Sequence, residues 1–163
     1  MKNEIAERKE NGLLTGATLL NNDLFGNNEK AKKITTLDLN DEEQSEMFLN
    51  SESEVDHKLN DCVGKVLDIV AVTLIERPVT EEIQNEETGE VGVRTYNKHT
   101  MILYDINGES YVTGSNSCYK SFVMIANVKG YMPTNEKHMQ LEVIKVPAKQ
   151  SGHNYLKLKL ATK

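Results

Sequence analysis

The sequence contains few of the residues that would indicate a cross-linked or membrane-spanning protein. Only two of its 163 residues are cysteines, Cys62 and Cys118, which is too few for a disulfide framework or a four-cysteine zinc site. We expect both to be buried or half-buried thiols. No stretch approaches the roughly 18 apolar residues of a transmembrane helix, and the N-terminal segment MKNEIAERKENG lacks the apolar core of a secretory signal.

The residue patterns of known catalytic sites are also missing. No two of the four histidines have the spacing of a metal-binding pair. They are His57, His99, His138 and His153. There is no glycine-rich phosphate loop, no Gly-x-Ser-x-Gly motif and no pair of carboxylates in an apolar setting. We therefore expect no enzymatic activity, no cofactor and no bound metal ion.

Aromatic residues make up only 6% of the chain, tryptophan is absent, and the net charge of −6 excludes a uniformly basic coat. The charge is unevenly distributed, however. Residues 1–60 hold 7 Lys and Arg against 13 Asp and Glu, whereas residues 92–163 hold 10 Lys and Arg against 4 Asp and Glu. A basic C-terminal half in an acidic protein predicts one positively charged functional face.

Two N-terminal regions are expected to differ from the rest. Glycines and asparagines punctuate residues 1–30, which predicts a flexible tail. Its short apolar piece at 19–25 is either a docking motif or a segment without a partner. Residues 34–38 predict a short strand, and Asn40 or Asp41 is suited to cap a short helix that follows.

The rest of a domain spanning residues 31–163 is mainly β-structure. The patterns predict three strands, one amphipathic helix and two further strands, at residues 63–75, 91–105, 110–113, 115–128, 139–146 and 154–161. Asn107-Gly108 is a strong hairpin signal between the second and third strands. This order is typical of a five-stranded Greek-key barrel, the OB-fold. An open antiparallel sheet with one helix on a face is the alternative.

Two strands carry patterns that suit a single-stranded nucleic acid. Alternation puts Arg94, Tyr96 and Lys98 on one face, where the cations can meet phosphates and the ring can stack on a base. The alternative is a solvated strip with Tyr96 packed on a neighbour. Tyr155, Lys157 and Lys159 repeat the pattern on the last strand. In an OB-fold both strips would border the oligonucleotide groove.

Four further residues complete the candidate nucleic-acid-binding set. Lys145 and Lys149 flank the turn into the last strand, and Lys120 is expected to face solvent on the helix. Tyr111 either joins the stacking face or packs inside the barrel.

Several short segments carry a resemblance to a known family. They are residues 59–65 (LNDCVGK), 111–115 (YVTGS), 119–122 (YKSF) and 151–155 (SGHNY). With the element order, they resemble small single-stranded-DNA-binding proteins of phages and conjugative elements of Gram-positive bacteria. The resemblance implies an OB-fold that coats single-stranded DNA without sequence preference during replication, recombination or conjugative transfer. It also implies a cytoplasmic location in a bacterium or infected host, and no cofactor.

One departure from cellular single-strand-binding proteins concerns the ends of the chain. Those proteins end in an acidic, partner-docking tail, whereas this chain has its acidic residues at the front and lysines at the end. Recruitment of replication or transfer proteins would therefore fall to the N-terminal tail. The acidic front is also expected to be able to fold onto the basic face and compete with DNA. RNA as a ligand and a homo-oligomeric state are both left open; no membrane contact is expected.

Two other functions compete with this one. The first is a protein-interaction OB module whose acidic N-terminal region mimics nucleic acid. The second is an oligosaccharide-binding barrel in which tyrosines stack on sugars.

Overall fold

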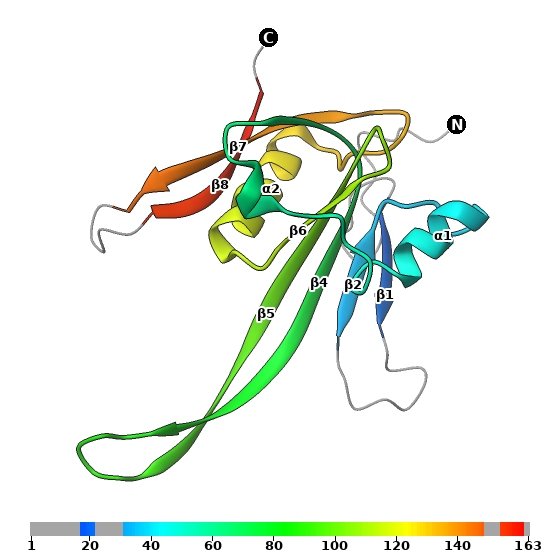
Figure 1. Cartoon of the computed structure of the whole chain (residues 1–163). Helices are drawn as coiled ribbons and strands as arrows, with labels where there is room; N and C mark the ends of the chain where they lie inside the picture. The colour runs from blue at the N-terminus through cyan, green and yellow to red at the C-terminus, as the bar shows by residue number, and fades with distance from the viewer. Residues whose placement is uncertain (1–16, 22–30, 149–153, 162–163) are drawn as a thin grey trace.

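The computed structural model describes residues 17–21, 31–148 and 154–161 (Figure 1). Among them no helix is long and apolar enough to cross a membrane. The elements follow in the order β1 Thr18–Asn21, β2 Lys32–Thr35, α1 Glu42–Leu49, β3 His57–Lys58, a 3-10 helix Leu59–Cys62, β4 Val66–Gln84, β5 Val91–Asp105, β6 Ser110–Thr113, α2 Asn116–Lys129, β7 Met139–Pro147 and β8 Asn154–Leu160.

The described strands form one hydrogen-bonded sheet. Its main path runs β1-β2-β4-β5-β6-β3, while β7 pairs with the first part of β4 and β8 pairs with β7. All pairings are antiparallel except the short one between β3 and β6. In the spatial order β7-β4-β5-β6, the last of these four strands along the chain, β7, lies beside the first, β4, which is a Greek-key arrangement.

β4 is long because it serves three neighbours. Its start, Val66–Ile69, pairs with β7. From Ile69 to Gln84 it pairs with β5, with a register irregularity between Ile69 and Ala71, and residues 73–76 also pair with β2 on the other edge. An irregularity of this kind bends a strand and increases its twist. The sheet can therefore curl so that one strand contributes to two parts of it.

The sheet is not closed into a barrel, because α2 lies against the outer edge of β8. The Ser117 Oγ donates to the Leu156 carbonyl at 2.7 Å, and the Leu158 N–H donates to the Ser121 Oγ at 2.9 Å. These serines use backbone groups of β8 on the edge that does not pair with β7. The predicted β-rich fold with a helix between β6 and β7 is thus confirmed, whereas barrel closure is not found among the described residues.

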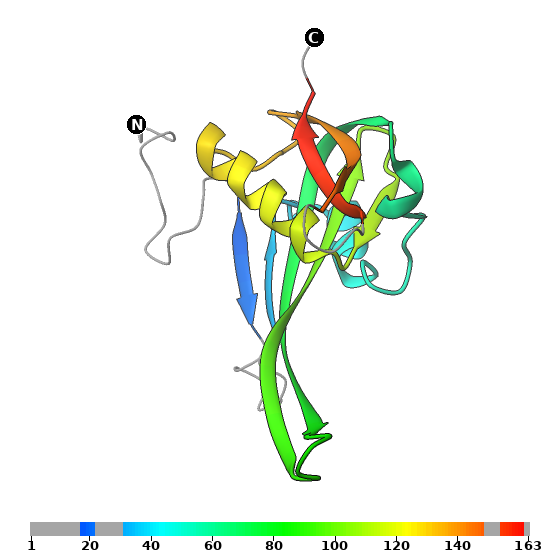
Figure 2. The ribbon, with the colours of Figure 1, turned by 90° about the vertical axis from the view of Figure 1, so that its left-hand side faces the viewer.

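The main core lies between α2 and the inner side of the curled sheet (Figure 2). Cys118, Phe122 and Ala126 are the buried residues of α2, four apart along one apolar stripe. The Ser115 side chain caps the helix by accepting from the Cys118 N–H, and Gly130 ends it in the left-handed conformation at φ 80°.

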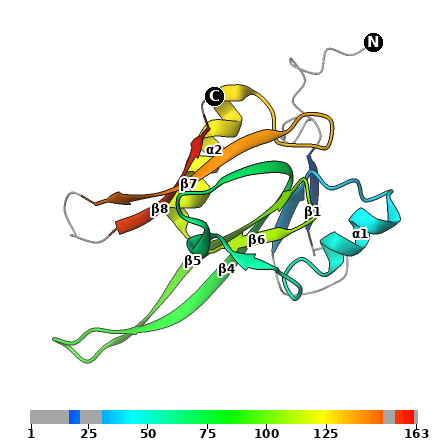
Figure 3. The same ribbon diagram turned by 45° about the horizontal axis from the view of Figure 1, so that its top comes forward.

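A second apolar cluster lies on the opposite side of the sheet, beneath α1. Phe48 of this helix packs with Ile75 of β4 and with Ile102 and Tyr104 of β5. Asp41 caps α1 by accepting from the Gln44 N–H, so of the two predicted caps the structure uses the second. α1 therefore covers this side of β5 at Ile102 and Tyr104, in the body of the protein (Figure 3).

Part of the predicted tail belongs to the sheet. Residues 18–21 form β1, which pairs with Lys32–Thr35 of β2. A segment of four residues can form a strand without an apolar core of its own when the edge of another strand, here β2, offers unpaired backbone groups. The prediction of a tail over residues 1–30 is therefore wrong for this segment, and the rest of that range, including residues 22–25 of the proposed docking motif, lies outside the described residues.

The β4–β5 hairpin extends as a long arm away from the body of the molecule (Figures 1 and 2). The sequence predicted a strand that ends at residue 75, whereas β4 continues to Gln84. Pro78 is tolerated because β2 pairs only with residues 73–76, which leaves Pro78 on a free edge of the arm. The arm is exposed along most of its length.

The buried cysteines lead to a first prediction. Both are free, as expected, and burial raises the pKa of Cys118 to about 12. In the unfolded chain this thiol ionises near its usual pKa of about 8.5. The folded form binds the proton more tightly, so its stabilising contribution is complete below the unfolded pKa and is lost as the pH rises toward 12. We expect the melting temperature measured by circular dichroism to fall between pH 9 and 12, and to fall less steeply in Cys118→Ala. Parallel pH profiles for the two proteins would contradict the assignment.

Candidate nucleic-acid interface

The β5 strip, Arg94, Tyr96 and Lys98, lies on the exposed arm. The guanidinium carbon of Arg94 is 4.9 Å from the centre of the Tyr96 ring. Arg94 also forms an ion pair with its cross-strand partner Glu81. Tyr96 remains 38% exposed. The strip thus presents a ring held beside a cation, as the sequence predicted, with one acidic neighbour that the sequence pattern did not predict.

The β8 strip, Tyr155, Lys157 and Lys159, is exposed on the last strand, and Tyr155 is 37% accessible. Its alternate residues Leu156 and Leu158 are buried in the main core, so the strip faces outward as predicted. Its neighbours on β7 across the ladder are apolar or acidic: Tyr155 pairs with Val146, Lys157 with Ile144 and Lys159 with Glu142.

The contacts of the described residues do not join the two strips. β4 and β7 separate β5 from β8 in the sheet. By alternation the β5 strip lies on the side that carries Ile102 and Tyr104, which is the side that α1 covers. The β8 strip lies on the outside of the β7–β8 hairpin. Both hairpins nevertheless project toward the same side of the molecule (Figures 1 and 3).

Tyr111 packs in the core, which is the second of the two alternatives open from sequence. It is 6% exposed, its hydroxyl donates to the Asp105 carboxylate at 2.7 Å, and its ring stacks on His57 with centroids 5.0 Å apart. Burial and the nearby Asp105 raise its pKa. Its ring is therefore not available to a nucleic-acid base.

The remaining lysine candidates are dispersed. Lys120 is exposed on α2, as expected, next to Tyr119, whose ring lies 4.4 Å from that of His99. Lys145 is exposed, but it pairs with Leu156. It therefore lies on the face of the hairpin opposite to Tyr155. Lys149 lies outside the described residues.

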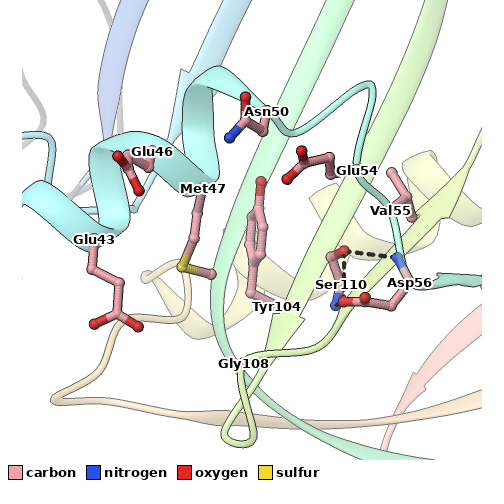
Figure 4. A pocket seen from close by; sticks show the side chains of 10 residues that line it. All are labelled: Glu43, Glu46, Met47, Asn50, Glu54, Val55, Asp56, Tyr104, Gly108 and Ser110. Atoms are coloured by element: carbon pink, nitrogen blue, oxygen red, sulfur yellow. Dashed lines mark hydrogen bonds between the residues drawn. The ribbon is translucent and has the colours of Figure 1, made fainter.

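An acidic surface covers the body of β5 on the α1 side. A pocket of about 380 Å³ lies between α1, the segment after it and the β5–β6 turn (Figure 4), and its acidic lining residues are Glu43, Glu46, Glu54 and Asp56. Tyr104 and Met47 form part of its wall. Asp56 is fixed there because its carboxylate accepts from the Ser110 N–H at 2.9 Å. Carboxylates at this density repel a phosphate backbone, so the pocket is not suited to an anionic strand.

The segment after α1 also reaches the cations at the base of the arm. Glu52 accepts two hydrogen bonds from Arg77, at 2.5 and 2.6 Å, and one from Lys33 at 3.2 Å. The Arg77 guanidinium, more than Lys33, holds the pKa of Glu52 below its usual value. The sequence did not predict this cluster, because Lys33 and Arg77 both lie outside the strands expected at residues 34–38 and 63–75. The signal that could have found it is charge, since Lys32-Lys33 is a basic pair in an otherwise acidic region.

No other centre of chemistry emerges in the part of the chain that the structure describes. Within it, no three His, Cys, Asp or Glu side chains gather in a way that could hold a metal ion. His138 bonds to Asp68 and to the Asn135 carbonyl, and His99 lies beside Glu76 and Tyr119. The exposed cation–aromatic strips are therefore the features with the clearest binding chemistry.

Comparisons with known proteins add no relative to this description. No protein-family model matches the chain. No curated protein and no solved structure matches it either.

Proposed function

We propose that this protein binds single-stranded DNA without sequence preference, as a coat during replication, recombination or conjugative transfer. The ligand contacts two hairpins, β4–β5 and β7–β8. On each, an exposed tyrosine stacks on a base while neighbouring cations neutralise phosphates. RNA would satisfy the same chemistry, because none of these groups distinguishes a 2′-hydroxyl.

The observation that carries the proposal is the Arg94–Tyr96 unit on the arm. A two-stranded ribbon that extends from a body has little packing to hold it, so its exposed groups are available to a ligand. Tyr96 is 38% exposed and lies beside the Arg94 guanidinium. The two residues together offer a flat ring and a positive charge. That combination matches the alternating base and phosphate groups of an unpaired strand.

The topology supports an OB-like domain. The strands β4 to β8 have Greek-key order, the helix lies between β6 and β7, and β4 is long and irregular at Ile69. In OB-folds the loops that join the first two and the last two strands border the oligonucleotide site. The corresponding hairpins here are the two that carry the strips; both extend toward the left in Figure 1, with the β4–β5 arm reaching far below β7–β8. An OB-like domain left open between β6 and β8 is therefore part of the proposal.

A fluorescence titration with oligo-dT at two salt concentrations tests this function. For single strands the slope of log affinity against log salt is about −0.7 per neutralised phosphate. Four exposed cations in the two strips predict a slope of about −3 if all of them engage; they are Arg94, Lys98, Lys157 and Lys159. A duplex of equal length is expected to bind more weakly. Equal affinity for the duplex, or no binding of either, would refute the proposal, and oligo-rU in parallel shows whether RNA also binds.

The acidic pocket under α1 favours a second candidate, a protein-interaction module that presents an acidic surface to a basic partner. The carboxylates of Glu43, Glu46 and Glu54 line one opening and are not paired with cations in the described contacts. Deleting residues 1–56 is not a clean test, since that range includes β2, which pairs with β4. A parent protein that binds a basic polypeptide but not oligo-dT, together with a Glu43→Gln, Glu46→Gln variant that loses the polypeptide, would support the second candidate over the first.

A further inference from the structure

Lys33 and Arg77 form a cationic pair on one face of the sheet. Lys33 of β2 is in register with Ile75 of β4, and Arg77 lies two residues further along β4, so both side chains leave the sheet on the same side. This is the side that α1 covers, where the Lys33 Nζ also lies 5.7 Å from the centre of the Phe48 ring. Neither side chain is buried; each keeps 25–33% of its surface accessible.

Lys33 and Arg77 bind the Glu52 carboxylate with the geometry in which they would bind a phosphate. Both oxygens of Glu52 engage the two terminal nitrogens of Arg77, and Oε2 is shared with the Lys33 Nζ. The planar guanidinium fork fits carboxylates and phosphates in the same two-bond geometry. A phosphate could therefore replace the Glu52 carboxylate without any change in the two cations.

The pair continues the β5 strip toward the body of the protein. Arg77 is the cross-strand partner of Lys98, and Tyr96 and Arg94 follow on the same face at alternate positions. The spacing of alternate residues along a strand is about 6.5–7 Å, comparable to the distance between successive phosphates of an extended strand. One row of positive groups thus runs from the exposed arm to the place where Glu52 lies.

We infer that Lys33 and Arg77 are a phosphate-binding site of the same nucleic-acid interface, and that Glu52 occupies it in the free protein. The inference rests on the proposed function, because its ligand is the phosphate backbone of the strand bound by the arm. When that strand extends toward the body, a phosphate replaces Glu52 and the acidic segment after α1 is released. The carboxylate therefore lowers the affinity of the free protein for nucleic acid and favours its release from short strands.

The test compares Glu52→Gln with Glu42→Gln, which removes one negative charge from the first turn of the adjacent helix without touching the pair. The Glu52 carboxylate competes with a phosphate for the same two cations, so we expect Glu52→Gln to bind oligo-dT about three- to tenfold more tightly than the parent. Glu42→Gln should change affinity by less than about twofold, since salt screens charges that are not in contact. Melting temperatures of both variants confirm that each is folded.

A second variant shows whether the gain comes from the cations. Adding Arg77→Gln to Glu52→Gln should cancel the gain and make the salt slope shallower by about 0.7, the value for one phosphate contact. Equal affinities of the Glu52 and Glu42 variants, or a gain that survives the loss of Arg77, would overturn the inference while leaving the proposed function intact. Salt-dependent binding of oligo-dT by the parent supports the proposed function separately. No binding of oligo-dT by the parent or by any of these variants would refute both.

Discussion

Replacing both Tyr96 and Tyr155 with alanine is expected to weaken the binding of oligo-dT by about thirtyfold or more. Stacking on an aromatic side chain contributes about 1–3 kcal/mol per base, and two rings at the low end of that range already give this factor. The low end applies because both rings are partly covered by their neighbours, with 38% and 37% of their surface exposed. The measurement is the oligo-dT titration at fixed, stated salt.

Phenylalanine at the same two positions provides the matched control. It keeps the rings and removes only the hydroxyls, neither of which forms a hydrogen bond that holds the described structure together. The double phenylalanine variant should therefore bind within a few-fold of the parent, with an unchanged salt slope. If the two double variants lose affinity equally, or if the alanine variant binds like the parent, base stacking on these hairpins is not the mode of binding.

Because the two strips are separate surfaces, the single alanine variants carry information as well. A strand that bridges both hairpins makes the two losses roughly additive for a long oligonucleotide. A short oligonucleotide that reaches only one hairpin should respond to one substitution and not to the other. The length at which both substitutions begin to matter therefore reports the distance that the bound strand covers.

Phe122→Ala is expected to produce the largest loss of stability. Phe122 is fully buried at the centre of α2 and belongs to the main core. Removing a buried phenylalanine side chain costs about 3–5 kcal/mol, from lost transfer energy and the cavity left behind. For a chain of this length that lowers the melting temperature by about 10 °C. Thermal unfolding followed by circular dichroism measures it.

Met124→Ala, two residues further along the same helix, is the matched control. Met124 is 65% exposed, so its truncation should change stability by no more than about 0.5 kcal/mol. A Phe122 variant as stable as the Met124 variant would show that α2 does not pack on the sheet as described. Since α2 also holds the edge of β8 through Ser117 and Ser121, the same result would question the position of the β8 strip.

Local features of the fold could be predicted from the sequence with good accuracy. The spacing of Tyr119, Phe122, Val123 and Ala126 predicts the face of α2 that packs on the sheet, although Cys118, rather than Tyr119 or Val123, is fully buried with Phe122 and Ala126. The alternation of leucines and charged residues in β8 identifies which side chains face outward. These predictions succeed because residue period and capping chemistry act over a few neighbouring residues.

Features that depend on distant segments could not be predicted in this way. A proline ends a strand in most sheets. Here the strand continues through Pro78, because β2 pairs only with residues 73–76 and does not use the N–H that proline lacks. Residues 18–21 have too little apolar surface to fold alone and become a strand only because β2 offers an edge. The sheet is left open because α2 lies on the edge of β8 and β3 pairs with the second edge of β6.

The amino-acid sequence alone determined the alternation of cations and rings on β5 and β8, the position of the helix and the separation of acidic from basic halves. Only the tertiary structure decided what each of those groups meets. It buried Tyr111 against Asp105, turned Lys145 to the opposite face from Tyr155, and brought Glu52 onto Lys33 and Arg77. The physical reason is that a side chain's period along its own strand sets the direction in which it points. Its partners are set by strand register and by chain segments that arrive from far away in the sequence.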